Sequence, residues 1–288
     1  MNKIGFIGTG VMGTGIINNL LRHGNPVLVY NRTKAHAQAV LDNGAQWADS
    51  PAAVTRQADI VFTMVGFPQD VEQVYFGDDG ILANATAGQY LVDMTTSKPS
   101  LAQRINTAGA KRGIHVLDAP VSGGDIGAKN GTLTVMVGGD AAVLDHLPPL
   151  FDQFSKTVSY YGPAGSGQHA KMANQIMIAG TMTGLTEALV YAKAAHLDLK
   201  QVIATLQGGA AENFSLGSYG PRILKGDYTP GFFAKHFLKD LRIALDESEA
   251  MGLNLPATSE AKRLYTELVD DRGLGNDGTQ ALIKLWWH

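Results

Sequence analysis

The chain has 288 residues, of which 45% are hydrophobic, enough for a sizeable core, and its formal net charge is only −3. The near balance of charge and the lack of basic runs argue against nucleic-acid and membrane-surface partners, and the absence of cysteine excludes disulfides, thiolate metal sites and cysteine nucleophiles. Without a leader-like start or an uninterrupted apolar span, the sequence predicts a cytoplasmic protein of two domains.

The first predicted strand, residues 3–7, runs directly into a glycine-rich turn and a helix, and a second strand follows at 27–30. Within this unit Gly8, Gly10 and Gly13 form the GxGxxG pattern of dinucleotide-binding turns. Gly8 permits the tight turn, Gly10 lets the backbone approach a pyrophosphate, and Gly13 lets the helix pack closely on the strand. The predicted cofactor contacts here are Gly8, Thr9, Gly10, Val11, Met12 and Gly13.

The end of the second strand is where a carboxylate selects NAD in such folds. Here the chain has Asn31, Arg32, Thr33 and Lys34. A neutral amide with two cations and a hydroxyl suits a 2'-phosphate, since Arg binds phosphate through charge-assisted, bidentate contacts. The sequence therefore predicts contacts from Asn31, Arg32 and Thr33 to NADP, with NAD as the second candidate. The alternative is that Arg32 and Lys34 are solvated charges at a helix start.

The chain then alternates between strand and helix, which predicts a parallel sheet with helices on both faces. The expected elements are a short helix after Pro51, strands at 59–65, 90–94, 114–118, 133–137 and 157–160, and helices at 70–76 and 100–112. Because ligands bind at the carboxyl ends of such strands, Val65, Gly66 and Thr96 are expected near the cofactor.

A second chemical stretch, Ser122, Gly123 and Gly124, follows a predicted strand. A hydroxyl beside successive backbone N–H groups forms a concavity suited to a carboxylate. The alternative is an ordinary glycine turn.

Strand signals stop after Gly162, and a proline-free helical pattern covers residues 168–193. Its apolar side chains fall on nearly every face, which predicts a helix buried all round and long enough to cross between domains or subunits. Such a helix needs cover, so we predict a homo-oligomer, a homodimer or homotetramer; a single monomeric species in sedimentation would contradict this. Lys171, near the helix start, has the simpler alternative of an amine that reaches solvent.

The third chemical stretch is Lys239 and Asp240, at the beginning of a helix that ends near residue 251. On an exposed helix such a pair is usually solvated and contributes little to stability.

Together, in this order, these stretches resemble the beta-hydroxyacid dehydrogenase family, which includes 3-hydroxyisobutyrate dehydrogenase, tartronate semialdehyde reductase and the glyoxylate and succinic semialdehyde reductases. The resemblance covers essentially the whole chain. It rests on GFIGTGVMG (5–13), DAPVSGG (118–124) with GTLTVMVGG (131–139), GSGQHAKMANQ (165–175) and KHFLKDLRIALD (235–246).

The resemblance implies an α/β Rossmann-like N-terminal domain (1–163), an all-α C-terminal domain (164–288) joined by the long helix, and an active site in the cleft between them. It also implies a role for each matched residue. Those roles are Lys171 as catalytic general acid/base, Asn174 and Gln175 as the substrate-orienting pair, Lys239 and Asp240 beside the nicotinamide and the lysine, Ser122, Gly123 and Gly124 as the carboxylate site, and Phe232 as a pocket residue. Many relatives have Asn where this chain has Gln175, a departure that affects reach more than chemistry.

The expected reaction moves hydride between NADP(H) and a small carboxylate-bearing aldehyde or hydroxy acid, without a metal. Lys171 would donate the proton as ammonium and accept it as amine, so burial or nearby positive charge should lower its pKa, with Asp240 opposing that shift. Two alternatives stay open: an imine reductase, whose members commonly have Asp or Tyr at the lysine position, and an NADP-binding sensor without turnover.

Overall fold

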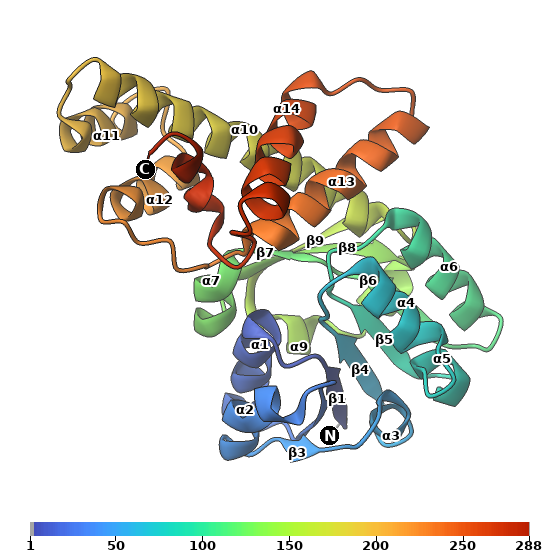
Figure 1. Ribbon diagram of the computed structural model, residues 1–288. Helices are drawn as coiled ribbons and strands as arrows, with labels where there is room; N and C mark the ends of the chain where they lie inside the picture. The colour runs from blue at the N-terminus through green and yellow to red at the C-terminus, as the bar shows by residue number, and fades with distance from the viewer. Residues whose placement is uncertain (1–2, 288) are drawn as a thin grey trace. The chain divides into compact units, whose positions relative to one another are not determined.

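The structure is a computed structural model that describes residues 3–287, apart from the side chain of Pro148. Its contacts divide the chain into two compact units, which meet in the sequence between Lys171 and Met172 (Figure 1). We call them the N-terminal and the C-terminal unit.

The N-terminal unit is built on a 9-stranded sheet in the order β3-β2-β1-β4-β5-β6-β8-β7, with β9 paired to β8. The strands are β1 (Ile4–Ile7), β2 (Val27–Tyr30), β3 (Gln46–Trp47), β4 (Ile60–Thr63), β5 (Tyr90–Asp93), β6 (His115–Asp118), β7 (Val121–Ser122), β8 (Leu133–Gly139) and β9 (Ser155–Gly162). The order 3-2-1-4-5-6 is that of dinucleotide-binding sheets. In register, Ile7 pairs with both Tyr30 and Thr63, so these strands end level at one edge.

The sheet is parallel from β3 to β6, as predicted, but the edge beyond β6 is mixed, which corrects the prediction there. β6 and β7 both run antiparallel to β8, whereas β8 and β9 are parallel. The reason is the reversal after β6: the chain passes through two-residue β7 and a short helix, then returns along the sheet. A two-residue strand carries no periodic signal, so the sequence could not reveal it.

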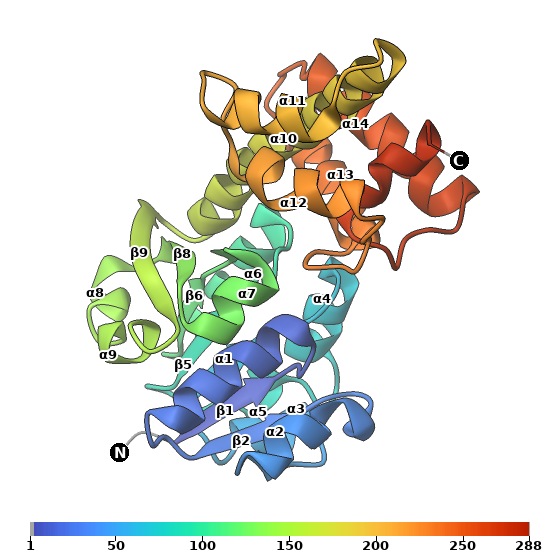
Figure 2. The same ribbon diagram turned by 90° about the vertical axis from the view of Figure 1, so that its left-hand side faces the viewer.

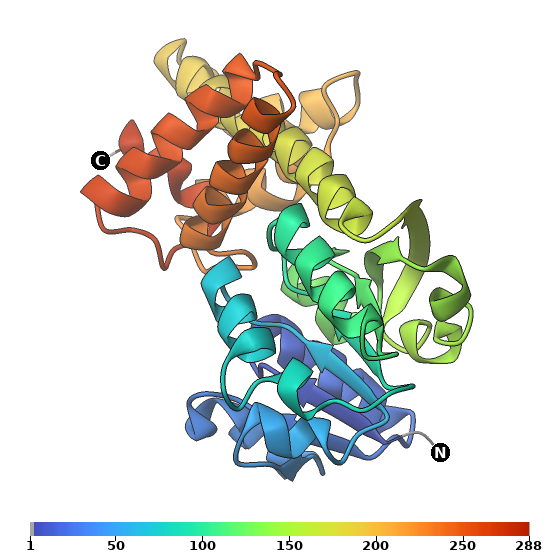
Figure 3. The same cartoon turned by 90° about the vertical axis from the view of Figure 1, so that its right-hand side faces the viewer.

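Helices cover both faces of this sheet, as predicted. They are α1 (Val11–Arg22), the 3-10 helix η1 (Lys34–Ala37), α2 (Gln38–Asp42), α3 (Pro51–Thr55), α4 (Pro68–Phe76), α5 (Ile81–Asn84), α6 (Pro99–Ala110), α7 (Gly124–Asn130), α8 (Ala141–Leu144) and α9 (Pro148–Phe151). One buried cluster joins the strands to α1, α2 and α7–α9, and Figure 2 shows α1 and α7 side by side on that face. A second cluster joins them to α3–α6, seen in Figure 3.

The C-terminal unit is helical, and the long helix α10 (Ser166–Ala194) enters it from the N-terminal unit. Its further helices are α11 (Leu199–Gln207), α12 (Phe214–Leu224), α13 (Ala234–Ala250), α14 (Pro256–Thr266), the π-helix η2 (Glu267–Asp271) and the 3-10 helix η3 (Thr279–Leu285). One core joins α10 to α13, α14, η2 and η3, and another joins it to α11, α12 and η3. The fold is therefore a Rossmann-like α/β unit followed by an all-helical unit, in which no described helix qualifies as a membrane span.

One face of α10 is exposed, so the prediction of burial all round was wrong for the single chain. Met177 is 69% and Tyr191 75% exposed. Between them Gly180 and Gly184 line a groove of about 510 Å³ along the helix. Apolar residues on every face predicted burial, but no other helix of the same chain covers this described face, where Gly180 and Gly184 leave the groove open. The homo-oligomer stays a prediction.

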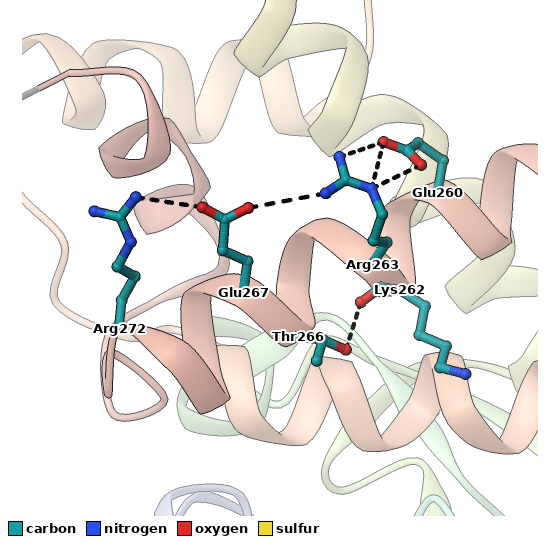
Figure 4. A network of polar contacts seen from close by, with 6 residues as sticks. All are labelled: Glu260, Lys262, Arg263, Thr266, Glu267 and Arg272. Carbon is teal, nitrogen blue, oxygen red and sulfur yellow. Dashed lines mark hydrogen bonds and ion pairs between the residues drawn. The ribbon is translucent and has the colours of Figure 1, made fainter.

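A charged groove on the C-terminal unit contains no predicted site residue. It has a volume of about 550 Å³ and is lined by Leu245, Ser259, Lys262, Arg263, Thr266, Glu267, Asp271 and Arg272. Figure 4 shows a row of alternating charges in it: Arg263 binds Glu260 and lies 3.9 Å from Glu267, which accepts from Arg272. Its two arginines, Arg263 and Arg272, each have a carboxylate partner within the C-terminal unit.

Candidate active site

The glycine turn between β1 and α1 has the geometry that a diphosphate site needs. Gly8 has φ +105°, and a Cβ there would lie 2.0 Å from the Met64 carbonyl oxygen; at Gly13 it would lie 2.1 Å from the Gly8 carbonyl oxygen. Gly10, in contrast, faces open space, with nothing within 4 Å of a built Cβ. Among the described residues the N-terminus of α1 has no side-chain cap and no acidic residue in its first turn. Its N–H groups therefore suit an anionic ligand.

The loop after β2 is tied to that glycine turn. The amide of Asn31 accepts from the Thr9 N–H at 3.0 Å and donates to the Thr33 carbonyl oxygen at 2.9 Å. Arg32 is exposed, and its guanidinium lies 3.2 Å from the Asp70 carboxylate, while the Lys34 ammonium lies 5.0 Å above the Trp47 ring. A monodentate pair leaves other donors of the Arg32 guanidinium available, and phosphate binding by this loop stays a prediction.

Beneath the ends of β4 and β5 lies a buried polar cluster that the sequence did not reveal. The Thr95 hydroxyl accepts from the Val65 N–H at 3.0 Å, and Asp93 accepts from the Thr95 N–H and the Thr63 hydroxyl at 3.0 and 2.9 Å. Burial raises the pKa of Asp93 from 3.8 to about 6, against the hydrogen bonds from Thr95 and Thr63, which lower it. Hydrogen bonds through Thr95 therefore connect this carboxylate to both loops that carry the predicted contacts Val65, Gly66 and Thr96.

The raised pKa of Asp93 predicts a loss of stability with rising pH. Because the folded chain holds this proton more tightly than the unfolded chain, the contribution is full below about pH 4 and is lost as pH rises through about 6. Two pKa units correspond to about 3 kcal/mol. In urea unfolding, the free energy of unfolding of wild type should therefore fall by about 2 kcal/mol relative to that of Asp93→Asn between pH 4.5 and 7.5. Asp152 is exposed, so Asp152→Asn should show the same change of unfolding free energy with pH as wild type. If Asp93→Asn also showed that same change, the raised pKa of Asp93 would be contradicted.

The predicted carboxylate loop forms the turn from β7 into α7. Gly123 has φ +125° and is exposed, while Ser122 is half-buried and pairs in the sheet with Thr134. Two residues that the sequence analysis missed hold α7 against α1. A Cβ on Gly15 would lie 2.7 Å from the Ala128 backbone, and the Asn19 amide donates to the Ala128 carbonyl oxygen at 2.7 Å. The Ser122 loop is thereby fixed to the helix of the glycine turn.

Lys171 lies in the second turn of α10 and is only 7% exposed. The beginning of this helix is held by Asp118, at the end of β6, which accepts from the Gly165 and Gln168 N–H groups at 2.7 and 2.9 Å. Burial raises the pKa of Asp118, although these N–H groups lower it. The DAPVSGG stretch therefore contributes a helix cap as well as the Ser122 loop, a role the sequence analysis did not assign.

In the C-terminal unit four of the predicted residues form one network. The Asn174 amide donates to the Gln175 side-chain oxygen at 2.8 Å, and the Gln175 amide donates to Asp240. The Lys239 ammonium lies 3.0 Å from the other Asp240 oxygen; Asp240 is buried and Lys239 is half-buried, with side-chain exposures of 1% and 11%. The solvated alternative for this pair was therefore wrong. The Phe232 ring packs edge-on against the Phe237 ring, with the ring centroids 5.9 Å apart, and its role in a pocket stays a prediction.

The comparisons with known proteins agree with this architecture. The family model described as the NAD binding domain of 6-phosphogluconate dehydrogenase matches residues 3–162, more than half of the chain. The model described as NAD-binding of NADP-dependent 3-hydroxyisobutyrate dehydrogenase matches residues 165–286. The chain belongs to the beta-hydroxyacid dehydrogenase family. As a family member it is an NAD(P)-dependent oxidoreductase, which confirms the predicted family and cofactor class.

Individual members of the beta-hydroxyacid dehydrogenase family match over nearly the full length. An uncharacterized oxidoreductase of Bacillus subtilis (strain 168) is 50% identical over 98% of both chains. The 2-hydroxy-3-oxopropionate reductase of Escherichia coli (strain K12) is 38% identical over 94% of this chain and 92% of its own. The structure of Mycobacterium tuberculosis 3-hydroxyisobutyrate dehydrogenase with L-serine has a TM-score of 0.90 at 27% identity, covering 100% of both chains. An imine reductase from Myxococcus stipitatus, at 21% identity over 98% of this chain and 99% of its own and a TM-score of 0.67, shares the fold alone.

Proposed function

We propose that the chain transfers hydride between NADP(H) and a short beta-hydroxy acid or the corresponding semialdehyde, with Lys171 as general acid/base. The observation that carries the proposal is the burial of Lys171 at 7% exposure in the second turn of α10. Asn174 and Gln175 follow it by three and four residues, so the three side chains share one side of the helix. A buried lysine with amide neighbours is suited to binding and protonating a carbonyl oxygen.

The chain's own groups would divide the work as follows. The Ser122 hydroxyl and the N–H groups of Gly123 and Gly124 would bind the substrate carboxylate and so fix which carbon is presented. Asn174 and Gln175 would orient the hydroxyl or carbonyl group. Lys171 as ammonium would donate a proton to the carbonyl oxygen during reduction, and as amine would accept it during oxidation. The reduced nicotinamide, when bound, supplies the hydride.

We further propose a preference for NADP over NAD, because Arg32, Thr33 and Lys34 present two cations and a hydroxyl where NAD enzymes present a carboxylate. Asn31, whose amide is already engaged within the loop, provides no negative charge to repel a 2'-phosphate. The NADP-dependent description of the second family model is consistent with this preference.

The test follows the absorbance of NADPH and NADH in parallel against glyoxylate, succinic semialdehyde, methylmalonate semialdehyde and tartronate semialdehyde. We expect turnover of at least one semialdehyde, faster with NADPH at low cofactor concentration. For Arg32→Ser, kcat/KM with NADPH should fall about 10–100-fold, since a charge-assisted contact contributes about 1.5–3 kcal/mol, while kcat/KM with NADH should change little.

Two results would contradict the proposal. Binding of NADPH without turnover of any of the four would favour a sensor, or, if cyclic imines were reduced instead, an imine reductase. Equal losses with NADPH and NADH in Arg32→Ser would remove the 2'-phosphate assignment. Lys129→Ser, a loss of one exposed lysine on α7, is the matched control for surface charge.

A further inference from the structure

The Gln168 side chain connects α10 to the loop after β5. It is fully buried at 0% exposure. Its oxygen accepts from the Ser97 N–H at 2.9 Å, and its nitrogen donates to the Thr95 carbonyl oxygen at 2.8 Å. Both functions of the amide are therefore used on backbone groups more than 70 residues away in the sequence. Thr96, a predicted cofactor contact, lies between these two residues.

The backbone of the same helical turn is fixed from the other side by Asp118. The Gly165 and Gln168 N–H groups donate to its two carboxylate oxygens. The first turn of α10 lies close to β6 and β8. A Cβ on Gly167 would lie 2.4 Å from the Met136 carbonyl oxygen, and a Cβ on Gly138 would lie 2.6 Å from an Asp118 carboxylate oxygen. The first turn of α10 thus has little freedom to slide or rotate against β6, β8 and the loop after β5.

We infer that Gln168 is a positioning residue for proton transfer, holding the Thr95–Ser97 loop and the helical turn that carries Lys171 in one register. Lys171 follows Gln168 by three residues, so rotation or translation of this turn moves its amine directly. A misplacement of about 1 Å can cost about 10²-fold in rate. The inference rests on the proposed acid/base role of Lys171, through which Gln168 acts.

The test is a double-mutant cycle in the full-length protein. Gln168→Ala should lower kcat about 10–100-fold when NADPH and substrate are both saturating, so that any change in the Kd for NADPH does not enter the comparison. In the Lys171→Ala background the same substitution should lower the single-turnover rate less than about twofold, because the group that it positions is gone. Gln168→Glu keeps an oxygen for the Ser97 N–H but loses the donor to Thr95; it should show the same coupling if Gln168→Ala does not fold.

The matched control is Gln89→Ala, at the opposite end of β5. Gln89 is also buried in the N-terminal unit and also bonds backbone groups, donating to the Thr55 and Ala58 carbonyl oxygens. It should lower stability and leave kcat within about twofold of wild type. A Gln168→Ala loss that persists in the Lys171→Ala background, or no loss at all, would overturn the inference. If Lys171→Ala itself retains activity, the proposed function fails instead, so the two failures are distinguishable.

Discussion

Replacing Lys171 with alanine should reduce kcat about 10³-fold, within the range of about 10²–10⁴-fold for loss of a general acid/base. The lysines within α10 are Lys171 and, in its last turn, Lys193. The rate should be measured at saturating NADPH and semialdehyde, and cofactor binding by fluorescence titration should be unchanged. Lys171→Arg should be equally impaired, because a guanidinium keeps the charge but does not release a proton near neutral pH.

Lys193→Ala is the control on the same helix. Its ammonium lies 4.4 Å from the Trp287 ring and is exposed, so its loss should cost some stability and no catalysis. If Lys171→Ala keeps a kcat within about threefold of wild type, Lys171 is not the acid/base. If both variants lose cofactor binding, the loss reflects the fold of α10 and not proton transfer.

The second large effect should separate two glycines of one turn. Gly8→Ala should lower the free energy of unfolding by about 3 kcal/mol or more, because alanine at positive φ is strained and its methyl group would meet the Met64 carbonyl oxygen. Gly10→Ala should leave stability within about 1 kcal/mol, because Gly10 has φ −67° and a methyl group there meets nothing within 4 Å. Yet its Kd for NADPH should rise about 10-fold or more, since that space is the expected path of the diphosphate.

Urea unfolding measures the predicted stability difference between Gly8→Ala and Gly10→Ala, and NADPH fluorescence titration measures the predicted loss of cofactor binding. Gly24→Ala isolates the backbone effect, because Gly24 also has positive φ but open space around it; it should cost about 1–2 kcal/mol. NADPH binding by Gly10→Ala as tight as that of wild type would place the diphosphate elsewhere. A stable Gly8→Ala protein would show that the loop after β4 can move away.

The sequence predicted those features that depend on local spacing. The GxGxxG turn, the helix α10 and the alternation of strands and helices are each encoded by residues close together in the sequence, and the structure contains all three. Two-residue β7 and the antiparallel course of β8 were missed because they depend on where the chain reverses, and propensity does not record that. The exposed face of α10 was missed for a related reason: apolar residues on every side predict burial, but not which side the same chain covers.

The candidate site divides in the same way. The family resemblance assigned roles to Lys171, Ser122 and Asp240, and those roles stay predictions, whereas the bonds that hold their elements in place did not show in the sequence. Gln168 and Thr95 are 73 residues apart, and Asn19 and Ala128 are 109 apart. Such pairs have no periodicity, and only the folded chain brings them into contact. The burial of Asp240 beside a half-buried Lys239 did not show in the sequence either, because an adjacent Lys-Asp pair is most often solvated.

The contact between α1 and α7 has a consequence for how such a chain can diversify. With Gly15 against Ala128 there is no room for a larger side chain, so α1 with its glycine turn and α7 with the Ser122 loop form one stiff block. On the proposed function, that block recognises the two features every substrate pair shares, a cofactor diphosphate and a carboxylate. Substitutions in the helices of the C-terminal unit would then change which substrate side chain is accepted, while the distance between the diphosphate site and the carboxylate site stays the same.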